Sequence, residues 1–202
     1  ESIQKSAESL LSLELNTPLH LSTEQIDKKK LSDAFKVLFN NGNVLLYNHF
    51  GSLEQGHLLS KIRYLAKALQ CEYIFLDHLS IVISGNESGD ERRNLDAIMT
   101  GLRSLVSETG IGLIVVSHLR RVFNDKGHEE GAATSLGQLR GSHGIAQLSD
   151  IVIGLERNQQ SAQNQNLTSV RVLKNRWSGE TGLCGRINFD PTTGRLSEHE
   201  EI

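Results

Sequence analysis

Hydrophobic residues recur at helical spacing in four stretches of the chain. One face of residues 1–15 carries Ile3, Ala7, Leu10, Leu11 and Leu15. One face of residues 52–69 carries Leu58, Ile62, Leu65 and Leu69. Apolar residues spaced three and four apart predict amphipathic helices there, and also over 32–39 and 91–108. Residues 136–148 predict a further helix with a Gly-rich break, after a long polar loop over 119–135.

Short apolar runs lie between the predicted helices. Tyr73–Leu76, Leu113–Val116 and Ile151–Leu155 are continuous rather than alternating. Such runs are typical of parallel strands covered by helices on both faces. The run 44–47 is a further strand candidate.

The later strands have a different character. Residues 170–173 and a terminal hairpin beginning at 184–189 are separated by Gly-rich turns, and they predict an antiparallel extension. The fold class is therefore α/β, with a mostly parallel sheet flanked by helices and an antiparallel C-terminal part.

Composition narrows the class of protein. The chain has 202 residues, a formal net charge of −3 and 38% hydrophobic residues, which suits one α/β domain. Its two Cys residues cannot form a disulfide framework, which indicates a reducing compartment. No apolar run approaches the roughly 20 residues of a membrane span, so no membrane partner is expected. Any nucleic acid would bind a local patch, because the chain is not coated in positive charge.

Polar residues follow two of the apolar runs. Asp77 comes directly after residues 73–76, and an acid in that place suits a nucleotide-bound Mg²⁺. A carboxylate that caps the next turn is the alternative. His118 ends the next strand, where a side chain can contact a terminal phosphate or serve a structural role.

Further candidates lie near the later strands. Gln147 precedes the run 151–155 and can face the same nucleotide. Arg157 ends that run, and Lys174 and Arg176 end the run 170–173. A guanidinium near a phosphate speeds phosphoryl transfer strongly, but solvated cations at strand ends are the plain alternative.

The polar loop offers cations for nucleic acid. Arg120 and Lys126 lie in it, and Arg140 follows it. Such residues can contact the phosphates of a single strand, although an ordinary solvated loop fits the charge as well. The residues 51–56 (GSLEQG) resemble a P-loop, but His57 and Leu58 stand where Lys and Ser or Thr belong. We interpret them as a decoy, so the chain lacks a phosphate cradle.

Several motifs in order then become familiar. They are YIFLDHLSIV (73–82), GNESGDER (85–92), VSHL (116–119), HEEG (128–131), LRGS (139–142), QLSD (147–150), LERNQQ (155–160) and KNRWSGETG (174–182). Together they resemble the helicase half of the bacteriophage T7-type primase-helicases, within the DnaB-like hexameric replicative helicases. The likeness runs over nearly the whole chain.

The resemblance implies a RecA-like fold and a ring, usually of six subunits. It implies hydrolysis of ATP or another NTP or dNTP with Mg²⁺, coupled to 5′-to-3′ movement on single-stranded DNA and unwinding. A replication polymerase and a primase are further partners that it admits. It implies the cytoplasm of a bacterial or phage-infected cell, with an organellar helicase as the alternative.

The resemblance also implies residue roles. Asp77 is the Mg²⁺ carboxylate and His118 the phosphate sensor. Arg176, with Lys174 beside it, is the arginine finger for the neighbouring subunit's nucleotide. Arg157 and Phe189 hold the base. The DNA-contacting residues are Arg120, Lys126, Arg140 and Gly141.

Residues 1–202 match a partial helicase C-terminal domain. The family's P-loop, the strand with its catalytic Glu and any primase domain would lie before Glu1. Two alternatives stay open. One is a recombinase-type RecA-like ATPase, and the other is a degenerate RecA-like module that binds DNA or a partner without catalysis.

Overall fold

The computed structural model describes residues 2–21, 26–47, 55–79, 91–120, 127–139 and 143–199. Its helices are α1 (Ile3–Leu15), α2 (Lys28–Phe39), α3 (Gln55–Lys67), α5 (Glu91–Thr109), the 3₁₀ turn η1 (Leu136–Gln138) and α6 (His143–Leu148). Its strands are β1 (Tyr73–Leu76), β2 (Gly112–Val115), β3 (Ile151–Arg157), β4 (Leu167–Asn175), β5 (Gly182–Asp190) and β6 (Arg195–Glu198). The alternation of helices with strands 1 to 3 agrees with the pattern of the sequence.

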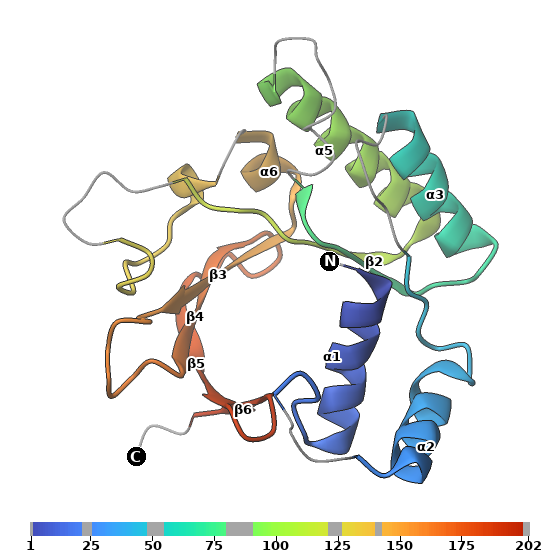
Figure 1. The fold of residues 1–202 in the computed structure, drawn as a ribbon. Helices are drawn as coiled ribbons and strands as arrows, with labels where there is room; N and C mark the ends of the chain where they lie inside the picture. Colours follow the sequence, from blue (N-terminus) through green and yellow to red (C-terminus); the bar gives the residue numbers. More distant parts are fainter. Residues whose placement is uncertain are drawn as a thin grey trace.

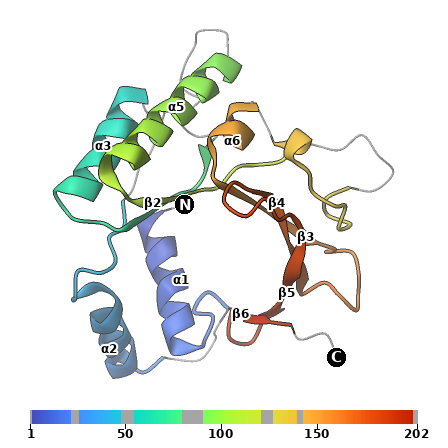
Figure 2. The ribbon, with the colours of Figure 1, turned by 180° about the vertical axis from the view of Figure 1, so that it is seen from behind.

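Helix α5 supplies the centre of the hydrophobic core. Its buried face carries Leu95, Ile98, Met99, Leu102 and Leu105. These positions recur every three or four residues, so a single face of the helix removes them from water. Helix α3 lies beside α5 and adds Leu58 and Ile62 to the same cluster (Figures 1 and 2). Gly110, with φ of +74°, ends α5 in a conformation that suits glycine.

Strands β1 and β2 form a parallel pair against this core. Ile74 and Leu76 pack on the core, whereas Tyr73 and Phe75 are 67% and 75% exposed. Ile114 on β2 is also exposed. The apolar runs predicted a sheet covered on both faces, and the described residues cover only one of them.

Strands β3 to β6 form an antiparallel sheet in sequential order. The pairing of β3 with β4 runs from Ile151 opposite Asn175 to Arg157 opposite Thr168 and shifts at Val152/Ile153. Such a shift marks a bulge, which bends the strand.

The strand at 151–157 pairs with β4 in the antiparallel sheet rather than with β2. The parallel part among the described residues is therefore shorter, and the antiparallel part longer, than the sequence pattern predicts.

The start of β3 shares the apolar character of β1 and β2. Val152 packs on the core, whereas Ile153 and Leu155 are 57% and 63% exposed. Neither β2 nor β3 has a second strand partner within the described part of the chain. The two strands thus leave open edges as well as an open apolar face.

Two predicted elements differ from the structure. The run 44–47 is irregular, and Leu45 and Tyr47 are half exposed. A strand needs a neighbour to pair with, and strand propensity alone does not supply one. Helix α2 begins at Lys28 rather than at residue 32, because the Asp27 carboxylate accepts a hydrogen bond from the Lys29 amide at 2.8 Å. The predicted first turn at 52–54 lies outside the described residues.

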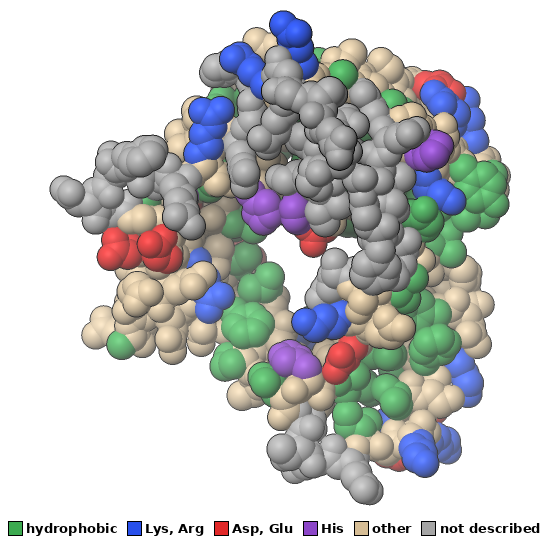
Figure 3. All heavy atoms as spheres, turned by 45° about the horizontal axis from the view of Figure 1, so that its top comes forward, with side chains coloured by type: hydrophobic (Ala, Val, Ile, Leu, Met, Phe, Trp, Pro, Cys, Tyr) green, Lys and Arg blue, Asp and Glu red, His purple; other side chains and the backbone are tan. Residues whose placement is uncertain are grey.

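The elements surround an opening in the middle of the molecule. Figures 1 and 2 show α1 and α2 on one side and the antiparallel sheet on the other, with the N-terminal end close to β2. Figure 3 shows the molecule hollowed there, with hydrophobic side chains along part of the rim. The Arg195 guanidinium donates to the Leu13 carbonyl at 2.6 Å, which joins β6 to the end of α1. No described helix is long and apolar enough to cross a membrane.

Candidate functional site

Asp77 and His118 lie at the same edge of the parallel strands. Leu76 pairs with Val115, and the Val116 amide donates to the Leu76 carbonyl at 2.9 Å, so the two strand ends run side by side. The rings of His78 and His118 meet edge to face with centroids 4.3 Å apart. The two strand ends that carry Asp77 and His118 therefore lie side by side.

Asp77 offers a carboxylate to solvent. Its side chain is exposed, and within the described ranges no other side chain bonds it. Carboxylate oxygen is a ligand type that Mg²⁺ prefers, usually one or two per site, with waters and phosphates completing the shell. No group of three His, Cys, Asp or Glu that could cage a metal occurs among the described residues. A metal shared with a nucleotide fits this donor set better than a metal held by protein alone.

His78 is a neighbour that the sequence reasoning missed. Its Nδ1 atom is buried and has no hydrogen-bond partner among the described groups. It stands directly after Asp77 and touches His118, so the strand end carries two imidazoles rather than one. The position of His78, directly after Asp77 in the sequence, is the feature from which this neighbour could have been predicted.

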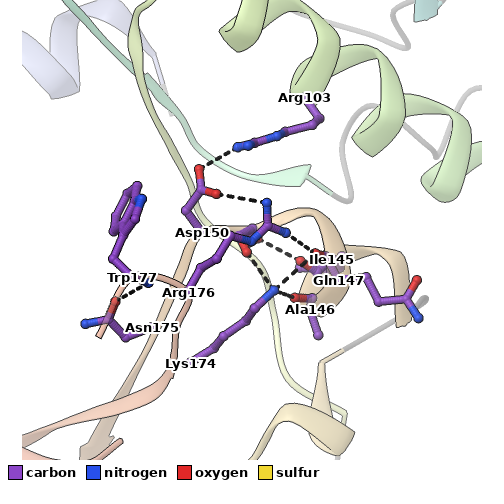
Figure 4. Close-up of polar contacts among 10 residues, drawn as sticks. Arg103, Ile145, Ala146, Gln147, Asp150, Lys174, Asn175, Arg176 and Trp177 are labelled. Carbon is purple, nitrogen blue, oxygen red and sulfur yellow. Dashed lines mark hydrogen bonds and ion pairs between the residues drawn. The ribbon is translucent and has the colours of Figure 1, made fainter. Parts of the chain in front are cut away.

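Lys174 and Arg176 gather at the C-terminal end of α6 (Figure 4). The Lys174 ammonium donates to the carbonyls of Ala146, Gln147 and Ser149 at 2.6, 3.1 and 2.8 Å. The Arg176 guanidinium donates to the Gln147 carbonyl at 2.7 Å. The last carbonyls of a helix lack intrahelical partners and attract cations, so these two side chains complete the helix end.

Gln147 takes part through its backbone. Its carbonyl accepts from both cations, whereas its side chain is exposed. The structure therefore brings Gln147, Lys174 and Arg176 together as predicted neighbours. The amide group that the sequence reasoning aimed at a nucleotide makes none of these contacts.

Asp150 joins this group and was not predicted. Its two carboxylate oxygens contact the Arg103 guanidinium at 2.5 Å and the Arg176 guanidinium at 3.2 Å (Figure 4). We call Arg103, Asp150, Lys174 and Arg176 the Asp150 cluster. Burial lowers the pKa of Lys174, and the positive charge of Arg176 lowers it further. The cluster holds three cations around one carboxylate, so it favours anions.

Arg157 and Phe189 lie at the other end of the antiparallel sheet. The Arg157 Nε donates to the Gln165 carbonyl at 2.5 Å, and the Phe189 amide donates to the Asn166 carbonyl at 2.9 Å. Both residues therefore border the same β3–β4 loop. The structure brings this predicted pair to one place, although the strands that carry them are not adjacent.

The predicted DNA loop is described only in part. The side chain of Arg120 is exposed, and its amide donates to the Gln138 carbonyl at 2.7 Å. His128 Nε2 lies 3.2 Å from the Arg120 carbonyl, which ties the two ends of the loop together. Lys126, Arg140 and Gly141 lie outside the described residues.

A buried ion pair anchors the end of this loop to the sheet. The Glu156 carboxylate accepts from Arg171 Nε at 2.7 Å and from the Thr134 amide and hydroxyl at 2.7 and 2.9 Å. Burial alone would raise the pKa of Glu156, but the hydrogen bonds from Arg171 and Thr134 outweigh it and hold that pKa below its ordinary value. A Cβ at Gly154 would collide with the Thr134 hydroxyl, so glycine permits this close approach.

We call Asp77, His78 and His118 the strand-end group, and its contacts differ from those of the Asp150 cluster. No hydrogen bond or ion pair found among the described residues joins Asp77 or His118 to Arg176. The chain therefore carries an exposed carboxylate at Asp77 and a 41% exposed guanidinium at Arg176 that share no bond among the described residues.

Comparison with known proteins gives this arrangement its context. The sequence profile of the DnaB-like helicase C terminal domain matches residues 2–198. The chain belongs to this family. It is 38% identical over 200 residues to the DNA helicase/primase of Enterobacteria phage T3, covering 97% of this chain and 35% of that protein. The DnaB-like chain thus spans about a third of its phage relative.

Solved structures share the fold. A DnaB-like replicative helicase, described with its interactions with primase, superposes with a TM-score of 0.79 over 99% of this chain and 49% of its own, at 19% identity. A second solved structure, an isolated ATPase domain, gives a TM-score of 0.77 over 99% of this chain and 72% of its own, also at 19% identity. The DnaB-like chain therefore has the RecA-like α/β fold that its motifs predict.

Proposed function

We propose that this chain is part of the motor of a replicative DNA helicase, which couples NTP hydrolysis to 5′-to-3′ movement on single-stranded DNA and to unwinding. The observation that carries the proposal is the family match over residues 2–198, together with 38% identity to a phage DNA helicase/primase. The phage relative supports a location of the protein in the cytoplasm of a bacterial or phage-infected cell.

Asp77 and His118 would serve one end of the nucleotide. The exposed Asp77 carboxylate suits a Mg²⁺ bound between nucleotide phosphates and water. The His118 imidazole, held against His78, would contact the terminal phosphate and respond to its loss. The exposed side chain of Gln147 would face the same nucleotide, while its carbonyl accepts a hydrogen bond from Arg176.

Arg176 and Lys174 would serve the nucleotide of the next subunit. An arginine finger must reach a phosphate that another chain holds, and Arg176 makes no contact with the described strand-end group of its own chain. The absence of such a contact within the described residues is compatible with a ring of identical subunits, which we take to be a hexamer as in the family. Each nucleotide would then lie between two subunits, so hydrolysis would change an interface.

Two further sets complete the proposal. Arg157 and Phe189, which border one loop, would hold the base. Arg120, Lys126, Arg140 and Gly141 would contact the DNA strand, each cation pairing with a phosphate. Because His118 and Arg120 are two residues apart, phosphate loss would act directly on the DNA loop. A primase and a polymerase are partners that we propose only by family.

The phosphate cradle would come from a segment before Glu1. Within the described residues β2 and β3 each have one unpaired edge, and Phe75, Ile114 and Leu155 are exposed, which supports this proposal because apolar strands with free edges need a cover. A further strand pairing there would continue the sheet and carry the P-loop to the strand ends beside Asp77.

The test compares the whole protein with residues 1–202 alone. We expect the whole protein to hydrolyse NTPs with stimulation by single-stranded DNA, and to unwind a forked duplex that has a 5′ tail. We expect negligible hydrolysis by residues 1–202, and loss of hydrolysis by the whole protein on Asp77→Ala. Release of a labelled strand and of phosphate are the two readouts.

Other outcomes would favour the alternatives. Strand exchange in place of unwinding would indicate a recombinase-type ATPase. DNA binding without hydrolysis by the whole protein would indicate a non-enzymatic module. Robust hydrolysis by residues 1–202 that depends on Asp77 would show that we have misplaced the phosphate site.

A further inference from the structure

Arg176 is held in its own subunit by three contacts, two through the guanidinium and one through the backbone. Its Nη1 lies 3.2 Å from the Asp150 carboxylate, and its Nη2 donates to the Gln147 carbonyl at 2.7 Å (Figure 4). Its backbone amide donates to the Asp150 carbonyl at 2.9 Å. Asp150 therefore contacts Arg176 through both its backbone and its side chain.

These contacts orient the guanidinium and leave some of its N–H donors without a partner from Asp150 or Gln147. Arginine has five N–H donors in a planar fork. Asp150 and Gln147 engage one terminal nitrogen each, and the side chain remains 41% exposed. The remaining donors stay available to an incoming anion, and three cations around one carboxylate leave the surroundings positive.

Asp150 is itself fixed from a different element. Its other oxygen contacts Arg103, which stands on α5, the helix that forms the centre of the core. The Asp150 side chain is 26% exposed and Arg103 is 35% exposed, so this pair is partly shielded from water. The chain of contacts from α5 through Asp150 to Arg176 therefore starts on a rigid helix.

We propose that Asp150 is a positioning residue for Arg176, and that Arg103 holds Asp150 in place from α5. The inference rests on the proposed function, in which Arg176 reaches the nucleotide of the neighbouring subunit. Asp150 does not touch that nucleotide. It sets the direction of the guanidinium before the nucleotide arrives, so less conformational freedom is lost when the finger engages.

The test is Asp150→Asn in the whole protein, with Glu108→Gln as a matched control. Glu108 also contacts two cations and lies at the end of α5, but its partners are Arg63 and Lys67. We expect Asp150→Asn to lower kcat for NTP hydrolysis roughly 10- to 100-fold, the scale of a misdirected group, at unchanged KM. Glu108→Gln should leave both values as in the wild type.

A double variant separates positioning from a general structural role. If Asp150 acts through Arg176, adding Asp150→Asn to Arg176→Ala should lower kcat no further. A further loss in that background would overturn the proposal. So would wild-type kcat in Asp150→Asn, or a rise in kcat, which would mean that Asp150 restrains the finger.

A second variant covers the case in which Asp150→Asn does not fold. The double variant Asp150→Asn/Arg103→Gln removes both charges of the partly buried pair, so Arg103 is not left without a carboxylate and only the more exposed Arg176 loses its partner. Its kcat should fall at unchanged KM, and wild-type kcat would overturn the proposal.

The failures of the two proposals are distinguishable. If Arg176→Ala is inactive while Asp150→Asn behaves as wild type, only the inference about Asp150 fails. If Arg176→Ala hydrolyses NTP normally, or the wild-type protein does not hydrolyse NTP, the proposed function fails and the inference falls with it.

Discussion

Two carboxylates in this domain each contact two cations, and both groups involve α5. Glu108 lies 3.0 Å from Arg63 and 2.6 Å from Lys67, while Asp150 lies 2.5 Å from Arg103 and 3.2 Å from Arg176. The chemistry of the contacts is the same. The origin of the partners is different.

Both partners of Glu108 stand one turn apart on α3, a helix that already packs on α5. The pair thus adds to an existing contact. The partners of Asp150 come from two different elements, α5 and the residue after β4. An ion pair is therefore informative about function when it joins elements that the core does not already join.

Removing one cation from each group should give the largest difference. We expect Arg176→Ala to lower kcat of the whole protein roughly 10³-fold or more, the usual scale for an arginine finger, while nucleotide binding is spared. Arg63→Ala should leave hydrolysis unchanged, because an exposed pair between packed helices touches no nucleotide. Steady-state hydrolysis and nucleotide titration measure the two effects. Equal loss of binding and turnover in Arg176→Ala would argue against the finger.

A third carboxylate, Glu156, tests the effect of burial. Its side chain is 8% exposed, and Glu156→Gln leaves Arg171 without a counter-charge. Because Arg171 is 30% exposed, water offsets part of the lost pairing, and we expect amide protection of residues 127–139 to fall roughly several-fold. Hydrogen exchange followed by mass spectrometry gives the local value. Glu180→Gln is the control, since no described residue bonds that carboxylate, and equal protection in both variants would contradict the anchoring role.

The smallest effect is expected at Glu108 itself. Hydrogen bonds from Arg63 and then Lys67 lower the pKa of Glu108 from 4.5 to about 2. A pKa that is lower in the folded state stabilises the fold above about pH 4.5, and this stabilisation is lost as the pH falls toward about 2. The Tm of Glu108→Gln should lie slightly below that of the wild type at neutral pH, and the gap should close over this window. A difference in Tm that grows as the pH falls would contradict a lowered pKa of Glu108 in the folded state.

The parts of the fold that depend on the spacing of nearby residues could be predicted from the sequence. The face of α5 from Leu95 to Leu105 follows helical spacing, and Asp77 and His118 follow apolar runs whose ends must meet in a parallel pair. These features depend on residues close in sequence or on a general rule of sheets. The prediction of a strand at 44–47 was wrong, because whether a strand finds a pairing partner does not depend on nearby sequence.

The Asp150 cluster depends on register, which the sequence does not display. Ile151 lies opposite Asn175, so the next step of the antiparallel pairing brings Asp150 to Arg176. A bulge follows at Val152/Ile153 and changes the pairing beyond it. Without the position of that bulge, the partner of Asp150 could not be chosen among the charged residues of β4.

The bond from Arg195 to the Leu13 carbonyl joins residues 182 positions apart. Closing so long a loop costs conformational entropy, and the one exposed bond returns little free energy against that cost. Neither α1 nor β6 contributes a residue to the core cluster built on α5, so the free energy of this exposed bond adds little to the stability of that core.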